Sequence, residues 1–268
     1  MELNRRNALS LTAAGLIHVA AQPESVNAAE MPRHSTELLV RQAAERGHTD
    51  LGWLKSFHSF SFGGYYDQQH MGFRSLRVIN DDKIAPGRGF PTHPHRDMEI
   101  ISYVLQGSLQ HKDSTGKGAI ITPDDVQMMS AGTGITHSEY NPSQVEANHF
   151  LQIWIQPSVR GVRPRYSDRK VKPDDKRNQW KQIVGPDGGR STVSVYQDAS
   201  IFATQLDAKQ SLDYTVEKGR HVWLQVARGS LIVNGTTLRA GDAIATSMAT
   251  GLHAVAEQDT EALLFDLG

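Results

Sequence analysis

The sequence predicts an all-β protein whose antiparallel strands form a barrel or a sandwich. Short runs in which apolar and polar residues alternate recur along the chain, and Gly, Pro and Asp punctuate them about every ten residues. The runs include "SLRVIN", "EIISYVL", "GAIIT", "HFLQIWI" and "VWLQVA". Sustained helical periodicity is scarce. The two halves of the chain also resemble each other, which indicates two related β-domains.

Residues 1–30 differ from the rest and have the layout of a cleavable export signal. Arg5 and Arg6 precede an apolar run from Ala8 to Ala21, and small residues follow near Ala28. The paired arginines and the softened apolar run are similar to a twin-arginine signal, which predicts a periplasmic protein. The alternative is an N-terminal tail on a cytoplasmic protein. The run is too short for a stable membrane span, so we expect no anchor.

Composition restricts the classes of partner. The 268 residues carry 28 Lys and Arg against 29 Asp and Glu, so no strong charge attracts nucleic acid or a membrane surface. This balance favours a small-molecule partner, and we expect a monomer. The chain has no cysteine, which excludes disulfides, thiolate nucleophiles and cysteine-based zinc sites. A bound metal ion would need histidine and carboxylate ligands.

A charged stretch with two prolines, Arg160 to Asn178, predicts a linker between two domains. We place the N-terminal domain at residues 36–160 and the C-terminal domain at residues 176–268. Each contains an apolar run, a Gly-Ser turn at Gly107 or Gly229, and a second apolar run. An internal duplication is the simplest explanation.

The clearest chemical signal is "GRGFPTHPHRDME", which contains His93, His95 and Glu99. In a strand, residues i and i+2 point to the same face, so the two histidines project side by side, about 7 Å apart at the backbone. A second segment, "MMSAGTGITHSEYN", places His137 and Glu139 at the same spacing after a glycine-rich turn. Two short strands can thus supply three imidazole nitrogens and one carboxylate. Such a set suits Fe(II), Mn, Co, Ni or Zn, and spacing alone does not choose among them.

The second half lacks this signal. When Gly107 is aligned with Gly229, Thr215 stands opposite His93 and Glu217 stands opposite His95. Only His253 falls near the position that is equivalent to His137. We therefore expect the C-terminal domain to hold no metal ion.

The pattern G-x5-H-x-H-x3-E, followed by a glycine turn and His137, resembles the two motifs of the cupin superfamily. A closer resemblance is to the pirin family, whose members are two-domain cupins and include bacterial quercetin 2,3-dioxygenases. The segments that carry this resemblance are "THPHRDMEIISYVLQG", "INDD", "MSAGTGITHSEYNP" and "LQIWIQP". The similarity runs from about Thr36 to the C-terminus.

This resemblance implies two cupin barrels of the jelly-roll, or double-stranded β-helix, type. It also implies that His93, His95, His137 and Glu139 bind one divalent metal ion in the N-terminal barrel. We expect Fe²⁺, with Mn, Co, Ni or Zn as alternatives. In cupins generally the motif-1 glutamate, here Glu99, is often a ligand. In pirins the carboxylate at the position of Glu139 takes that place, so we expect Glu99 either to stand behind the ligands or to be a strand residue.

The activity that the resemblance implies is opening of the heterocycle of a flavonol such as quercetin, with consumption of O2 and release of carbon monoxide. Glu139 is the candidate base for the 3-hydroxyl proton. A planar substrate needs apolar shelter, for which the candidates are Phe57, Phe60, Phe62, Met128 and Met129. The alternative is a non-catalytic, metal- or redox-responsive pirin that regulates a protein partner.

Overall fold

The computed structural model describes residues 38–123, 125–188 and 192–268. These residues form 22 strands, one 3-10 turn at Ala43–Glu45 and one short helix, α1, at Pro173–Lys176. None of the described helices is long and apolar enough to cross a membrane. The predicted export signal lies outside the described residues.

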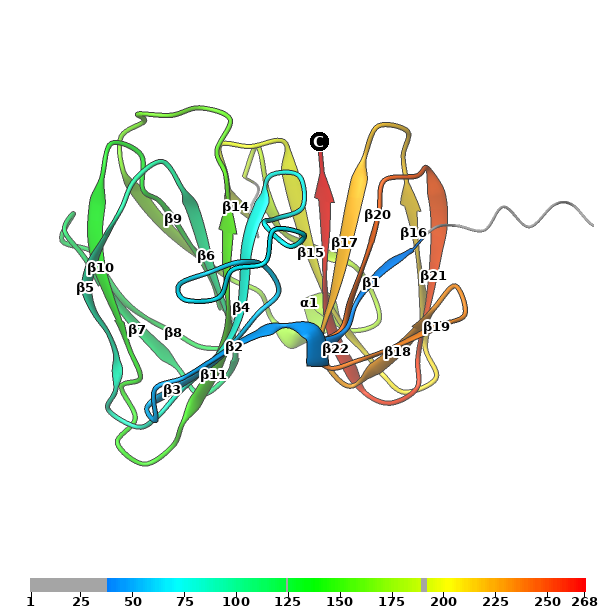
Figure 1. Cartoon of the computed structure of the whole chain (residues 1–268), viewed down its shortest axis with the longest axis horizontal. Helices are drawn as coiled ribbons and strands as arrows, with labels where there is room; N and C mark the ends of the chain where they lie inside the picture. The colour runs from blue at the N-terminus through cyan, green and yellow to red at the C-terminus, as the bar shows by residue number, and fades with distance from the viewer. Residues whose placement is uncertain (1–37, 124, 189–191) are drawn as a thin grey trace, which may run out of the picture. The chain divides into compact units, whose positions relative to one another are not determined.

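The N-terminal barrel consists of a seven-stranded sheet and a four-stranded sheet (Figure 1). The seven-stranded sheet contains, in order, β12 (Arg165–Lys170), β9 (Asp125–Ser130), β6 (Glu99–Gln106), β11 (Asn148–Ile155), β4 (Leu76–Ile84), β3 (Leu54–His58) and β2 (Gly47–Asp50). The four-stranded sheet contains β5 (Gly89–His95), β10 (Ile135–Tyr140), β7 (Leu109–Asp113) and β8 (Gly118–Ile121). All neighbouring strands in these two sheets are antiparallel.

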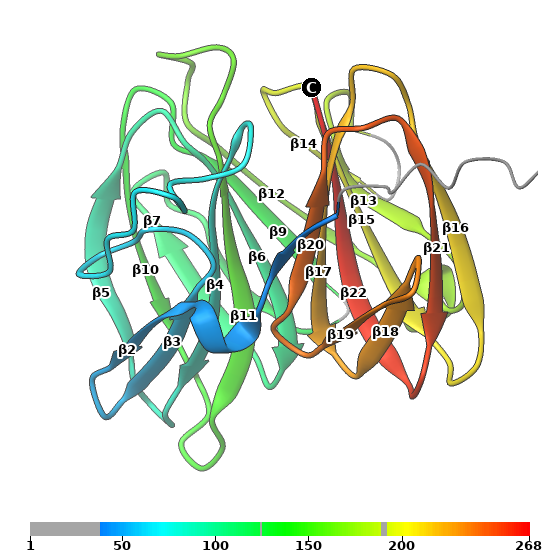
Figure 2. The same ribbon diagram turned by 45° about the vertical axis from the view of Figure 1, so that its right-hand side comes forward.

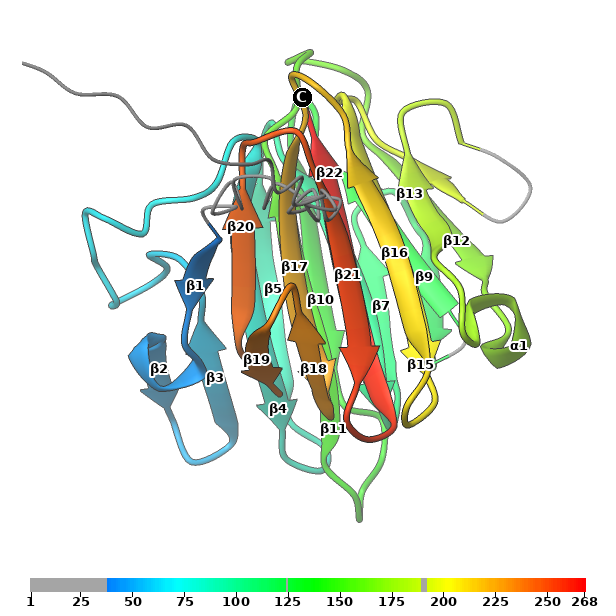
Figure 3. The same ribbon diagram turned by 90° about the vertical axis from the view of Figure 1, so that its right-hand side faces the viewer.

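The C-terminal barrel repeats this arrangement; in Figure 3 this barrel faces the viewer. Its seven-stranded sheet contains β1 (Leu39–Arg41), β20 (Ala243–Thr246), β17 (His221–Arg228), β22 (Thr260–Leu267), β15 (Ala199–Leu206), β13 (Lys181–Gly185) and β14 (Val193–Ser194). Its four-stranded sheet contains β16 (Ser211–Val216), β21 (Thr250–Ala256), β18 (Ser230–Val233) and β19 (Thr236–Arg239). The predicted fold class, two cupin barrels in one chain, is confirmed.

Matching glycines mark the duplication. Gly107 directly follows β6 and Gly229 directly follows β17, and both have a left-handed backbone, with φ of +71° and +79°. Residues with a Cβ avoid this conformation, so glycine permits the tight turn into the next strand at both places. The Gly-Ser turns of the sequence are therefore the same structural feature in the two barrels.

The two seven-stranded sheets pack face to face through a shared apolar core. Along β6, Ile101 and Tyr103 enter this core, whereas Ile100, Ser102 and Val104 point into the N-terminal barrel. A strand that is buried on both faces reads as the continuous apolar run that the sequence shows here. A buried polar group also joins the barrels. Tyr103 donates a hydrogen bond to Glu261 (2.6 Å), and the buried Lys176 ammonium donates one to the Tyr103 hydroxyl (2.9 Å).

Two segments lie differently from the domain division that the sequence suggests. The first described strand, β1, precedes the N-terminal barrel but pairs with β20 of the C-terminal one (Figure 2). The charged linker is also partly ordered, because β12 pairs with β9 along the edge of the N-terminal sheet. An edge strand keeps one side in solvent and tolerates charged side chains, which is why "RYSDRK" shows no strand pattern.

Candidate metal centre

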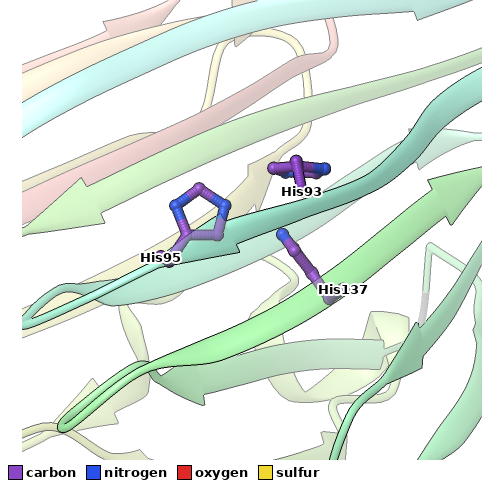
Figure 4. Close-up of side chains that lie close together, drawn as sticks. All are labelled: His93, His95 and His137. Carbon is purple, nitrogen blue, oxygen red and sulfur yellow. The ribbon is translucent and has the colours of Figure 1, made fainter.

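Three histidines from two neighbouring strands converge inside the N-terminal barrel (Figure 4). His93 and His95 project from β5, and His137 of β10 lies directly opposite His93 in the strand register. The ring centroids are 4.8 Å apart for His93 and His95, 4.5 Å for His93 and His137, and 4.9 Å for His95 and His137. One nitrogen from each ring lies within 4.8 Å of the other two, so a single ion could contact all three.

The chain on both sides of this group favours the arrangement. Gly132, in the turn before β10, has φ of +46°, and a Cβ there would collide with the backbone of Val162. Glycine therefore allows the turn to pass close to the neighbouring segment. The β5–β10 pairing also shifts register between His137 and Glu139, so that Glu139 faces Phe90. Such an irregularity re-aims side chains and is common beside functional sites.

Hydrogen bonds indicate which nitrogen is free in two of the three rings. His93 donates from Nδ1 to the carbonyl of Pro91 (2.8 Å), which leaves its Nε2 as an unprotonated acceptor. The Nε2 atom of His137 is buried and has no hydrogen-bond partner. A buried nitrogen without a partner is rare in folded proteins and calls for a ligand. This atom fits a metal ion that is coordinated by neutral imidazole.

Sequence reasoning missed the residues that orient His137. His111 of β7 places its Nδ1 3.3 Å from the Nδ1 of His137, and its Nε2 donates to Asp113 (2.9 Å). Asp113 also accepts hydrogen bonds from the amide and hydroxyl of Thr115, which stabilise its charged form. The chain of hydrogen bonds places a proton on Nδ1 of His137 and leaves Nε2 free. A signal was present, because "LQHKD" again spaces His111 and Asp113 at i and i+2.

Electrostatics keep the histidines in the form that binds metal ions. Burial, with the nearby His93, lowers the pKa of His95 to about 4. Burial and the neighbouring histidines lower the pKa of His137 to about 2. Both rings are therefore neutral at physiological pH, and a neutral imidazole is the form that coordinates a metal ion. Three imidazole nitrogens with a carboxylate nearby fit one divalent transition metal ion.

Glu139 lies beside the histidines, but its carboxylate oxygens are not close to all three imidazole rings at once. It is fully buried on β10, and one of its oxygens falls within reach of His137 and His111. Gln152 donates to one carboxylate oxygen (2.6 Å) and Ser102 donates to the other (3.1 Å). Burial nevertheless raises the pKa of Glu139 to about 7. A carboxyl group that titrates near neutral pH is suited to exchanging protons with a substrate.

A cavity of about 340 Å³ opens next to this group and is lined by His93, His95 and Glu139. Three aromatic side chains form much of its wall, namely Phe62, Phe90 and Trp154. Its volume is in the range of small-molecule sites. Of the other residues proposed for shelter, Phe60 and Met128 belong to the core between the barrels, and Met129 packs in a separate apolar cluster. Phe57 stacks on His48 and lies under Arg46, so it is not part of the cavity wall.

Glu99 points away from the histidines. It is buried at the start of β6, where it accepts hydrogen bonds from the Ser130 hydroxyl (2.8 Å) and the Tyr196 amide (3.2 Å). Glu99 and Ile101 share the face of β6 that is turned toward the other barrel. These contacts fit the expectation that Glu99 is a strand residue, and none of them reaches the histidines.

The C-terminal barrel has a different interior. Its core is aliphatic and includes Val222, Leu224, Leu252 and Leu264. His253 is on the exposed face of β21 and pairs with Asp213 (2.7 Å). Within the described residues, both groups that could hold a metal ion lie in the N-terminal barrel.

Comparison with known proteins decides the family. Residues 39–155 match the Pirin family model, and residues 182–267 match the model of the quercetinase C-terminal cupin domain. A quercetin 2,3-dioxygenase of Escherichia coli K12 is 44% identical over 231 residues, which cover 86% of this chain and 98% of that protein. The chain belongs to the pirin family. A pirin-like protein of Caulobacter vibrioides is 38% identical over 82% of this pirin and 95% of its own length.

Solved structures agree with this assignment. The crystal structure of YhhW from E. coli superimposes on this pirin with a TM-score of 0.82 at 42% identity, covering 86% of this chain and 97% of that one. A second structure of YhhW, in complex with nickel(II), has a TM-score of 0.81. The relatives support a metal-dependent dioxygenase at the level of the family, and the nickel complex together with the histidine group supports a single metal site.

Proposed function

We propose that this pirin is a dioxygenase of the quercetin 2,3-dioxygenase type, which opens the heterocycle of a flavonol with O2 and releases carbon monoxide. The observation that carries the proposal is the position of Glu139, a buried carboxyl group on the same cavity as His93 and His95. A histidine group alone would be compatible with a structural or a catalytic metal site of many kinds. A base beside it, facing an aromatic-lined cavity, favours deprotonation of a planar hydroxylated substrate.

In this proposal His93, His95 and His137 hold one divalent ion through imidazole nitrogens, and Glu139 serves as a fourth ligand and as the base. We propose Fe²⁺, although Mn, Co, Ni and Zn suit the same donors. The ion, when bound, would acidify the flavonol hydroxyl and stabilise the negative charge that develops in the reaction.

The protein itself would position the substrate and move its proton. Glu139 would take the proton of the 3-hydroxyl, and the hydrogen bonds from Ser102 and Gln152 would fix the direction of its carboxylate. Phe62, Phe90 and Trp154 would hold the flat rings and exclude water from the reacting atoms.

Aerobic incubation of Fe(II)-loaded protein with quercetin tests the proposal. We expect loss of the flavonol absorbance, uptake of O2 and release of carbon monoxide, all of them absent in a His137→Ala variant. A folded, metal-loaded protein that leaves quercetin unchanged would contradict it. That result would instead favour the role of a metal-responsive binding protein that regulates a partner.

We also propose that residues 1–30 direct this pirin to the periplasm through the twin-arginine route. The support is the sequence pattern around Arg5 and Arg6.

A further inference from the structure

Two buried polar atoms on the cavity wall have no hydrogen-bond partner. They are Oδ1 of Asp82 and Nε1 of Trp154. Asp82 lies on β4, is only 2% exposed and belongs to the "INDD" segment, to which the proposed reaction assigns no role. Buried polar groups in folded proteins are almost always paired. An unpaired carboxylate oxygen on a ligand-sized cavity therefore indicates that a donor arrives from outside the protein.

Strand register gives the position of Asp82 relative to the proposed base. Asn80 pairs with Gln152 across β4 and β11, and Gln152 holds Glu139. Asp82 is two residues further along β4 and on the same face, which corresponds to a step of about 7 Å. The cavity thus has Glu139 and the histidines at one position and a second carboxylate displaced along the strand.

Flat rings line the same cavity, and the strand register places Trp154 on the side of Gln152 away from Asp82, because Trp154 pairs with Val78 whereas Asp82 pairs with Phe150. Trp154 meets Phe62 edge to face, with ring centroids 5.3 Å apart, and it meets His95 in the same way at 5.0 Å. Phe90 also lines the cavity and packs edge to face against Trp53 (5.4 Å). Aromatic walls favour a planar ring system, since such rings stack or meet edge to face.

We propose that Asp82 accepts a hydrogen bond from a ring hydroxyl of the substrate, at the end of the molecule remote from the oxygen that faces the histidines. Asp82 is then a specificity-determining residue that selects planar aromatics with at least two separated hydroxyl groups. This inference rests on the proposed flavonol activity and specifies which flavonols the site prefers.

The surroundings of Asp82 fit this role. Burial raises the pKa of Asp82 to about 7; a hydrogen bond with Ser56 compensates in part, and the negative charges of Asp81 and Glu139 add smaller upward contributions. A phenolic hydroxyl that donates to this carboxylate would replace the water that burial has removed. A buried acceptor that is left without a partner costs free energy, so a hydrogen bond from the substrate to Asp82 should be visible in affinity.

The test is a binding titration under nitrogen, so that no turnover occurs, with the nickel(II)-loaded full chain. The two probes are quercetin, which has several ring hydroxyls, and 3-hydroxyflavone, which has only the 3-hydroxyl. We expect wild type to bind quercetin at least ~10-fold more tightly. Asp82→Asn should reduce this preference to within about twofold while 3-hydroxyflavone binds as before.

Asp81→Asn is the matched control. Asp81 directly precedes Asp82 on β4 and points to the other face of the strand. It forms hydrogen bonds with His149 (2.5 Å) and Arg46 (3.2 Å) outside the cavity. The preference for quercetin should survive in this variant. A wild type without preference, or an Asp82→Asn variant that keeps it, would overturn the inference and leave the proposed function standing. If neither flavonol binds the wild type, both fail.

Discussion

Replacing Asp82 by Asn should make the stability of the metal-free protein less sensitive to pH. Burial raises the pKa of Asp82 from 3.8 to about 7. The folded state therefore holds a proton that the unfolded chain has already lost. Stability from this group is fully present below pH 4 and is lost as the pH rises through 7. A pKa raised from 3.8 to about 7 corresponds to at most about 4 kcal/mol. Asn does not ionise, so the variant lacks this decrease in the free energy of unfolding with rising pH.

Urea unfolding of both proteins, followed by tryptophan fluorescence at intervals from pH 4.5 to 8.5, measures the effect. Glu139 also has a raised pKa but is present in both chains, so its contribution largely cancels in the difference. We expect the free energy of unfolding of the variant, relative to wild type, to increase by up to about 3 kcal/mol across this range, which begins above the ordinary pKa of an aspartate. Parallel profiles would show that Asp82 is already ionised or solvated in the folded protein, and the reasoning would be refuted.

Three further outcomes follow from the site and the sequence. Glu139→Gln should retain most of the metal while flavonol turnover falls by at least ~10²-fold, whereas Glu99→Gln, away from the cavity, should change turnover little. Similar turnover in the two variants would contradict the role of Glu139 as the base. His111→Phe should weaken metal affinity by ~10- to 100-fold, measured by competition with a chelator, because His137 loses the group that fixes its tautomer. Replacing Arg5-Arg6 by two lysines should retain the protein in the cytoplasm, as fractionation would show; native protein that keeps Met1 there would argue against export.

The β-fold and the histidine pairs could be predicted from the sequence because both depend on side chains alternating between the two faces of a strand. A strand that is buried on one face must alternate, and the same alternation places His93 and His95 side by side. The glycine turns were readable because few other residues adopt a left-handed backbone. Both features are local, so one stretch of sequence contains them.

The remainder depends on pairing between distant strands. Nothing near Leu39 in the sequence reveals that β1 pairs with β20, since that contact joins opposite ends of the chain. The roles of Gln152 and Ser102 arise only when β11 and β6 lie side by side beneath Glu139. The sequence did not decide between the two roles expected for Glu99, because its partners Ser130 and Tyr196 are far away along the chain.

Metal stoichiometry tests the central claim most directly. Purified chain is loaded with Fe(II) or Ni(II), freed of excess ion and analysed by mass spectrometry for metal per chain. We predict about one ion per chain for wild type and for His253→Ala, and almost none for His93→Ala or His137→Ala. A value near two that falls when His253 is removed, or an unchanged value without His137, would contradict a single centre in the N-terminal barrel.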